Sequence, residues 1–255
     1  MYFFLGNLSC LETCYISTIL PRLLASLLRG DRIISFSRCF VQFYFFACLA
    51  GTECYLLCVM SYDRYLAICK PLHYSALMNG RFCLQLAGGS WISGFLANSI
   101  TIFFMSRLTF CGPNEINHFF CDFSPVIRLS CSDSHLMKLL ALILASVYTL
   151  PPFILLMSYV YIMITLLGIH SSIRRQKAFS TCSSHLIVVT IFYGTLTMVY
   201  VLPDANTLRD LHKWFSAFYT VLTPIANPLI YSLGNREVKN AIRKTLRRFK
   251  VSQEF

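Results

Sequence analysis

The chain has 255 residues, of which 56% are apolar and only 13% are charged, and its mean hydropathy is +0.60. A soluble domain ordinarily carries about 25% charged residues, so the composition excludes an ordinary soluble domain and favours a protein with several membrane spans. The formal net charge of +11 makes nucleic-acid binding an alternative. The positions of the basic residues along the chain decide between the two.

Six long segments contain almost no Asp, Glu, Lys or Arg, and they predict six membrane-spanning helices. Each is at least as long as the roughly 20 residues that cross about 30 Å of hydrocarbon at 1.5 Å per residue. In lipid the backbone polar groups must be paired within the segment, and no segment alternates apolar and polar residues as barrel strands do. The sequence therefore predicts an all-α membrane protein that forms one domain over residues 1–255, with spans at 1–21, 39–62, 82–106, 139–169, 179–203 and 214–235.

The basic residues gather on one side of the predicted membrane. Three lie between the second and third spans, three between the fourth and fifth, and seven after the sixth, whereas only three acids accompany them. This asymmetry follows the positive-inside rule, so these loops and the carboxyl terminus are expected in the cytoplasm. With six spans the amino terminus is expected there too. Because membrane orientation explains the positive charge, a nucleic-acid partner is not expected.

Four cysteines are expected on the outer side, where an oxidising compartment allows disulfides to form. Cys39 opens the second span, and Cys111, Cys121 and Cys131 lie in the long loop after the third span. Four cysteines allow three pairings, and their spacing alone does not choose among them.

Short motifs follow one another along the predicted spans. They are MYFFL at 1–5, MSYDRYLAIC at 60–69, PLHY at 71–74, Ser158-Tyr159, KAFSTC at 177–182 and PIANPLIY at 224–231. In this order, and on these spans, they make the chain resemble the olfactory branch of the rhodopsin-like G-protein-coupled receptors from its first residue into its tail. The resemblance implies a seven-helix receptor bundle truncated to six helices, with the six predicted spans corresponding to helices two to seven.

The resemblance also implies a pairing of the outer cysteines. In the family the cysteine of the third helix is tied to the middle loop cysteine, and the two outer loop cysteines are joined to each other. The implied disulfides are Cys39–Cys121 and Cys111–Cys131. The first bond would hold the outer loop as a lid over the helical bundle.

Asp63 and Arg64 follow directly after the second span. Charged side chains at this position are costly in lipid unless they lie within the protein or at the membrane surface. In the resembled receptors this arginine is held at rest and contacts a G protein when the receptor is active. A merely interfacial ion pair is the alternative. The residues that the resemblance assigns to the switch are Asp63, Arg64, Tyr65, Tyr159, Lys177, Asn227, Pro228 and Tyr231.

Glu12 and Glu53 are the only acids within the spans, and a carboxylate at this depth marks a functional site by default. In related receptors the matching positions and Asn227 form a polar core that holds a sodium ion or a proton. The alternative is a pair of neutral acids satisfied by the neighbouring backbone. No other cofactor is expected.

A ligand pocket can be placed by helical arithmetic. Phe46 lies 18 residues before Arg64, about 27 Å along the same helix, and small residues beside it leave space. These positions resemble the family's odorant cavity, which is mostly apolar with a few hydroxyls. Plain helix packing by small residues is the alternative. The candidate ligand-binding residues are Phe46, Ala47, Ala50, Gly51, Leu196, Tyr200 and Thr220.

The resemblance implies a multi-pass receptor of the plasma membrane that binds a small hydrophobic volatile ligand and activates a heterotrimeric G protein at its cytoplasmic face. Its tail, residues 235–255, carries Val238, Ile242, Leu246 and Phe249 at helical spacing among basic residues, which indicates an amphipathic helix on the anionic leaflet of the lipid bilayer.

Three alternatives compete with this prediction. A truncated, nonfunctional receptor product would contain the same motifs. A transporter or channel could also have six spans, but the inverted repeat that is common in transporters is not evident in this sequence. An enzyme is not expected, because no catalytic triad, phosphate loop or metal-binding histidine pair occurs. His118 and Asp122, beside Cys121, provide too few ligands to predict a metal site.

Overall fold

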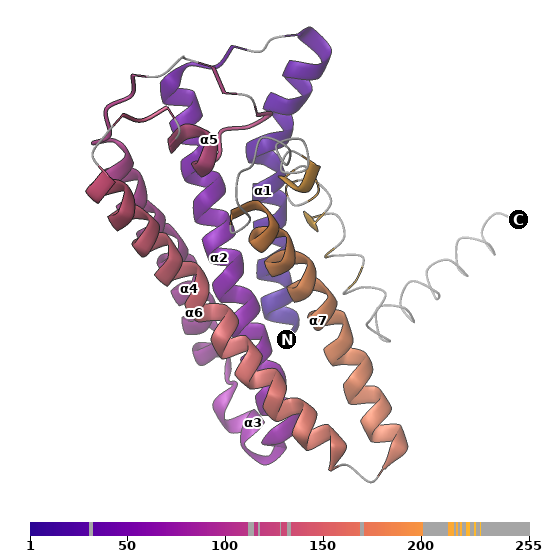
Figure 1. Cartoon of the computed structure of the whole chain (residues 1–255). Coiled ribbons are helices and arrows are strands. Elements are labelled where there is room, and N and C mark those ends of the chain that lie inside the picture. The colour runs from indigo at the N-terminus through magenta and orange to yellow at the C-terminus, as the bar shows by residue number, and fades with distance from the viewer. Residues whose placement is uncertain are drawn as a thin grey trace, which may run out of the picture.

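A computed structural model describes residues 1–30, 33–111, 115–116, 118–127, 129–131, 134–168 and 171–200, together with positions 214–216, 218, 220, 223, 224, 227 and 230. Figure 1 shows long helices running side by side, with the outer loop crossing one end of the bundle. The helices are α1 (Tyr2–Arg29), α2 (Phe36–Cys69), α3 (Pro71–Leu77), α4 (Gly80–Met105), α5 (Phe123–Ile127), α6 (Ser134–Leu167) and α7 (Ser172–Tyr200).

The all-α membrane fold predicted from composition is confirmed. Within the described residues five helices, α1, α2, α4, α6 and α7, are long and apolar enough to cross a membrane. They correspond to the first five predicted spans. The sixth predicted span, 214–235, lies outside the described residues except for a few positions.

The helices α1 and α2 extend beyond the apolar segments that predicted them. The helix α1 continues past Pro21 to Arg29 and ends at Gly30, whose φ of 65° suits a residue without a side chain. The helix α2 begins after Ser35, whose hydroxyl accepts a hydrogen bond from the Arg38 backbone N–H. Polar residues at the membrane surface can continue a helix beyond the part that lies in hydrocarbon. Hydropathy alone therefore underestimates the length of the helix.

The helix α2 lies at the centre of the bundle and contacts α1, α4, α6 and α7. Its largest apolar cluster joins residues from α1, α2, α6 and α7 and the outer loop. Buried members of this cluster include Leu11, Tyr15, Phe46, Ala50, Leu57, Phe120, Tyr159 and Phe192.

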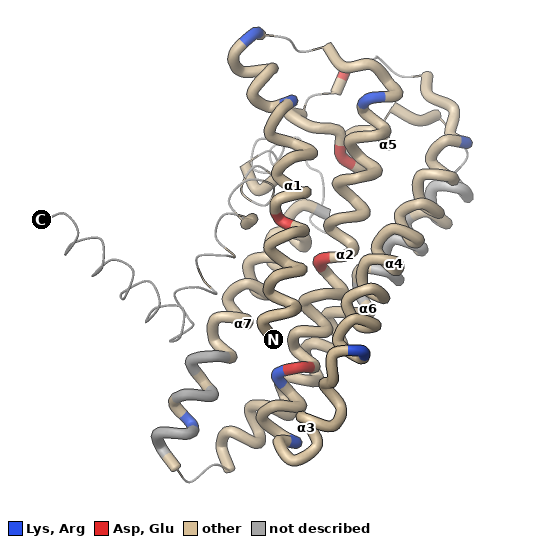
Figure 2. Tube along the Cα trace, turned by 180° about the vertical axis from the view of Figure 1, so that it is seen from behind, with Lys and Arg blue, Asp and Glu red and all other residues tan. Residues whose placement is uncertain are grey.

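Charged residues lie mainly at the two ends of the bundle, and two acidic positions lie within α1 and α2 (Figure 2). Arg64 near the end of α2, Lys70 before α3 and Arg81 at the start of α4 lie at the end that bears α3. This separation agrees with spans whose middles face lipid and whose ends face water. The domain assignment over 1–255 stays a prediction, since the tail at 235–255 lies outside the described residues.

The helices α2 and α4 approach each other closely at Gly94. A β-carbon placed on Gly94 would lie 2.5 Å from the Thr52 backbone nitrogen and would also collide with the Thr52 hydroxyl. Only a residue without a side chain permits this approach, as small residues commonly do at helix interfaces in membranes.

Gly94→Ala is therefore expected to lower the free energy of unfolding by about 1–3 kcal/mol, because the added methyl group forces the two helices apart. The measurement is the thermal unfolding midpoint of the purified protein in detergent. Gly88→Ala on the same helix is the matched control, since a β-carbon there meets nothing within 4 Å. Equal midpoints for the two variants would contradict the packing argument.

Candidate functional site

The inner end of α2 carries the predicted arginine switch. The Arg64 Nη2 atom lies 3.7 Å from the buried Asp63 Oδ2 atom. The hydroxyl of Tyr74, on α3, donates a hydrogen bond of 3.0 Å to Asp63 Oδ1. Partial burial and the nearby Asp63 carboxylate raise the pKa of Tyr74 to about 12, so this hydroxyl keeps its proton at physiological pH.

A second contact joins α6 to α7 beside Arg64. The Tyr159 hydroxyl is hydrogen-bonded to Nδ1 of His185, and both side chains are buried. The Arg64 guanidinium lies within electrostatic range of both residues. Tyr65 packs against Tyr161 of α6 with ring centroids 6.1 Å apart. The structure thus brings Asp63, Arg64, Tyr65 and Tyr159 to one end of the bundle.

The three predicted polar-core residues also converge. Nδ2 of Asn227 donates a hydrogen bond of 3.3 Å to Oε1 of Glu53, and the Asn227 amide interacts with the Glu12 carboxyl as well. All three side chains are buried. Within the described part of the chain, Glu12 Oε1 and Asn227 Oδ1 have no hydrogen-bond partner. The cluster therefore presents buried oxygen atoms that no described residue satisfies.

Part of the predicted ligand pocket is brought together above the polar core. Phe46 and Ala50 belong to the large apolar cluster, and Leu196 of α7 packs against it. The Phe46 ring lies 4.9 Å, centroid to centroid, from the rings of Tyr15 and of Phe120 in the outer loop. Phe46 thus lies between the bundle and the loop that covers it. Thr220 is buried and donates its hydroxyl hydrogen to the Ser216 carbonyl.

Gly51 is a correction to the predicted pocket. A β-carbon on Gly51 would lie 2.9 Å from Asn98 Nδ2 and 3.3 Å from the Gly94 Cα atom, so this residue faces α4. Ala47 belongs to a different apolar cluster, with Met105 and the outer loop. The alternative of helix packing by small residues therefore describes Gly51, and the same packing accounts for Ala47.

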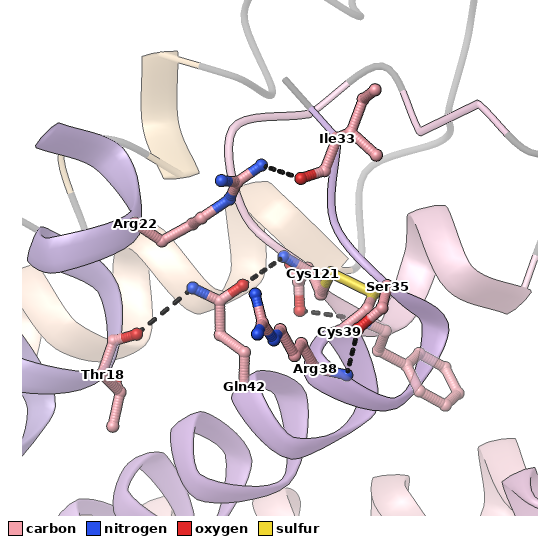
Figure 3. The surroundings of a disulfide bond; sticks show 10 residues. Thr18, Arg22, Ile33, Ser35, Arg38, Cys39, Gln42 and Cys121 are labelled. Carbon is pink, nitrogen blue, oxygen red and sulfur yellow. Dashed lines mark hydrogen bonds between the residues drawn. A yellow bond between two sulfur atoms is a disulfide. The ribbon is translucent and has the colours of Figure 1, made fainter. Parts of the chain in front are cut away.

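The outer end of α2 is held covalently and by hydrogen bonds (Figure 3). The structure contains the disulfides Cys39–Cys121 and Cys111–Cys131. Beside the first, Gln42 donates from Nε2 to the Thr18 carbonyl of α1 and accepts at Oε1 from the Cys121 backbone N–H, each at 3.2 Å. One buried amide thereby ties α1 and α2 to the loop. Cys121 is in a disulfide, so no thiolate stands between His118 and Asp122.

Several predicted positions lie outside what the structure describes. The side chains of Lys177 and Tyr200 are among them, as are Pro228, Tyr231 and the tail at 235–255. Their roles stay predictions.

The sequence analysis missed several other residues that tie neighbouring helices together. Gln42, Asn98, Tyr148 and His185 each contact another helix or the loop. Asn98 Nδ2, for example, donates a hydrogen bond of 3.0 Å to the Ala47 carbonyl. A polar side chain within an apolar span was the available signal, because such a group must find a partner inside the protein.

The amino-acid sequence is similar to those of known receptors along almost its whole length. A family model described as "Olfactory receptor" matches residues 1–248. The chain is 51% identical to human Olfactory receptor 6B1 over 245 residues, which cover 96% of this chain and 78% of that receptor. It is 49% identical to human Olfactory receptor 11L1, covering 97% of this chain and 77% of the relative. It is also 49% identical to mouse Olfactory receptor 6Z7, covering 96% and 79%.

Cys39→Ser is expected to reduce the amount of protein at the cell surface severalfold. The lost bond spans 82 residues of sequence, and closing a loop of that length contributes about 4 kcal/mol in the chain-entropy account. Antibody labelling of intact cells measures the surface fraction. Cys10→Ser removes an exposed free cysteine and is the control. Wild-type surface levels for Cys39→Ser would exclude a stabilising role for the bond.

Proposed function

Because this chain belongs to the olfactory receptor family, we propose that it binds a small hydrophobic volatile ligand inside the helical bundle and activates a heterotrimeric G protein at its cytoplasmic face. Members of this family are multi-pass, G-protein-coupled membrane receptors and are not enzymes. Similarity over 96% of the chain does not favour the alternative of a nonfunctional product. The observation that carries the proposal is the Asp63–Arg64 pair beside the hydrogen bond between α6 and α7.

The ligand site is proposed around Phe46, Ala50 and Leu196, with Tyr200 and Thr220 completing it. Phe46 and the loop residue Phe120 supply an apolar wall and cover, and Thr220 supplies a hydroxyl. Such a site suits a small apolar molecule with one polar group. Gly51 is left out because it faces α4, and Ala47 because it packs in the separate cluster with Met105.

The signal is proposed to travel as a shift between two packings of the bundle. A ligand favours whichever packing it binds more tightly, and it can shift the population only by that difference. Separation of α7 from α6 at the inner end would break the Tyr159–His185 bond and expose Arg64 to the G protein. Lys177 is proposed to join this surface, and Asn227, Pro228 and Tyr231 to permit the rearrangement.

The polar core is proposed to hold a sodium ion or a proton. Two carboxyl groups buried close together are costly unless a positive charge compensates them. The unsatisfied oxygens of Glu12 and Asn227, with the Glu53 carboxylate, are ligands that a hard cation prefers. Glu12, Glu53 and Asn227 therefore fit the ion, which would supply positive charge in the middle of the bundle.

The receptor is proposed to reside in the plasma membrane with its carboxyl terminus in the cytoplasm. The positive-inside distribution supports this orientation. The basic tail, 235–255, is proposed to lie on the anionic inner leaflet of the bilayer.

Arg64→Ala is expected to abolish the odorant-evoked rise in cAMP while leaving surface expression intact, because the guanidinium that meets the G protein is gone. A panel of aliphatic alcohols, aldehydes and esters supplies the stimulus, and a cAMP reporter in transfected cells supplies the readout. Arg81→Ala, at the start of α4, is the matched control. A wild-type response from Arg64→Ala would remove this arginine from the mechanism, and no wild-type response to any odorant would refute the function.

Sodium chloride is expected to raise the thermal unfolding midpoint of the wild-type protein relative to choline chloride. At a sodium concentration ten times the dissociation constant, binding contributes about 1.4 kcal/mol, which corresponds to about 3–5 °C. Glu53→Gln should lose this difference. Glu115→Gln removes an exposed acid of the outer loop and should keep it. A midpoint that rises on acidification but ignores sodium would assign the core to a proton instead.

A further inference from the structure

Gln42 lies one turn of α2 outward of Phe46, the residue at the centre of the proposed odorant site. The two residues are four positions apart and therefore share one face of the helix. Three elements meet at Phe46, because its ring lies 4.9 Å from the rings of Tyr15 on α1 and of Phe120 in the outer loop. Gln42 connects the same three elements one turn further out.

Both ends of the Gln42 amide are engaged (Figure 3). Its Nε2 atom donates to the Thr18 carbonyl of α1, and its Oε1 atom accepts from the backbone N–H of Cys121, each at 3.2 Å. The residue is 9% exposed, so water competes little for either bond. Because a buried amide group without a partner is costly, the two bonds are expected to form and break together.

The bond to the loop fixes the peptide unit that joins Phe120 to Cys121. The atoms from the Phe120 Cα to the Cys121 Cα lie in one plane, and the N–H that donates to Gln42 is part of that plane. The disulfide to Cys39 tethers the Cys121 side chain, but it leaves rotation about single bonds. The Gln42 bond therefore orients the Phe120 ring over Phe46, which the disulfide alone does not do.

The bond to α1 holds the other side of the same junction. Thr18 lies in the turn of α1 that precedes Pro21, a residue that has no backbone N–H to contribute to the helix. A carbonyl oxygen has two acceptor sites, so Thr18 can accept from Gln42 without leaving its own helix. The outer loop is thus connected to α1 through the Gln42 side chain.

We propose that the Gln42 amide is a latch that holds the outer loop closed over the odorant site, and that an odorant enters and leaves when the two hydrogen bonds of this amide break. This inference rests on the proposed function. Gln42 is a positioning residue, since it acts on the odorant through Phe120 and Phe46. The Cys39–Cys121 bond stays intact, so the loop swings about a fixed point and closes again.

The latch controls rates more than affinity. Both of its bonds are made to the protein and neither to the odorant, so their loss lowers the barrier to entry and the barrier to exit alike. The loss of two neutral hydrogen bonds corresponds to about tenfold or more in the rate of opening.

The first test measures the latch without an odorant, on the full chain in phosphatidylcholine nanodiscs. Cys39 and Cys121 are buried, whereas Cys111 and Cys131 are exposed, so a water-soluble phosphine should reduce the first disulfide more slowly than the second. Gln42→Leu should raise the initial rate of Cys39–Cys121 reduction about tenfold and leave the exposed disulfide, the internal reference, unchanged. Mass spectrometry of the alkylated thiols measures both rates. A wild-type rate for Cys39–Cys121 in this variant would overturn the latch.

Gln42→Glu separates the two hydrogen bonds from the shape of the side chain. A neutral carboxyl group can donate to the Thr18 carbonyl and accept from the Cys121 N–H, as the amide does, whereas a carboxylate can only accept. Reduction of Cys39–Cys121 in this variant should be fast at about pH 7.5 and should return to the wild-type rate at about pH 4.5, where the new carboxyl group is protonated. Equal acceleration at both pH values would count against the latch.

The charges around Gln42 set the acidic condition. Arg22 and Arg38 line the cavity that Gln42 also lines and favour the ionised carboxyl, while the buried Asp122 of the loop opposes it. Wild type and Gln85→Glu, which changes an exposed glutamine of α4, carry the same surroundings and should show no such recovery. Thermal unfolding midpoints establish that each variant is folded, and if Gln42→Leu does not fold, the two pH values of Gln42→Glu decide the question.

The second test adds an odorant. The probe is the most potent member of the panel of aliphatic alcohols, aldehydes and esters, in tritiated form. In Gln42→Leu its association and dissociation rate constants should both rise about tenfold, while the dissociation constant stays nearly unchanged. Wild-type odorant rates in a variant whose disulfide is reduced rapidly would overturn the loop as the route of entry. If no odorant of the panel binds the wild-type protein, the proposed function fails, and the reduction rates still decide whether Gln42 is a latch.

Discussion

Lipid offers no hydrogen-bond partners, so every polar group within the spans must find one in the protein. Many hydroxyls are satisfied within their own helix, where Thr52, Ser90 and Ser158 each donate to the carbonyl four residues earlier. Carboxyl, amide and imidazole groups carry more hydrogen-bonding atoms than one carbonyl of their own helix can satisfy, and Asn98 Nδ2 donates both to the Gly94 carbonyl of its own helix and to the Ala47 carbonyl of α2. Such groups reach across to another helix, as Asn98 and Asn227 do, and their contacts determine which helices lie together.

The helix α2 collects most of these cross-helix contacts. Its outer end bears the Cys39 disulfide and Gln42, its middle bears Glu53, and its inner end bears Asp63 and Arg64. A ligand beside Phe46 therefore touches the same rigid element that carries the polar core and the arginine. Because α2 contacts α1, α4, α6 and α7, a change in its packing against one neighbour affects the others.

The features that follow directly from the need to cross a lipid bilayer could be predicted from the sequence. The length of the apolar segments located the first five spans, and the Asp63-Arg64 pair located the inner end of α2. Both signals can be read from residue types alone. Hydropathy could not extend α1 to Arg29 or predict the short helices α3 and α5, because caps and local packing determine these. Helical arithmetic placed Gly51 along α2, but it could not say that the residue faces α4. The partners of Gln42 and His185 depend on long-range packing, which a single sequence does not contain.

The two ends of the bundle differ in how firmly they are held, and this difference indicates where movement is possible. At the outer end a covalent bond joins α2 to the loop, and Gln42 adds hydrogen bonds to α1 and to that loop. At the inner end, by contrast, the contacts between elements among the described residues are noncovalent, and they include the Tyr74–Asp63 bond and the Tyr159–His185 bond. Each of these is worth about 1–3 kcal/mol or less, which is within the differential affinity that a small ligand can supply. A shift in packing should therefore open the inner end, because breaking weak contacts there costs less than distorting the disulfide-linked outer end.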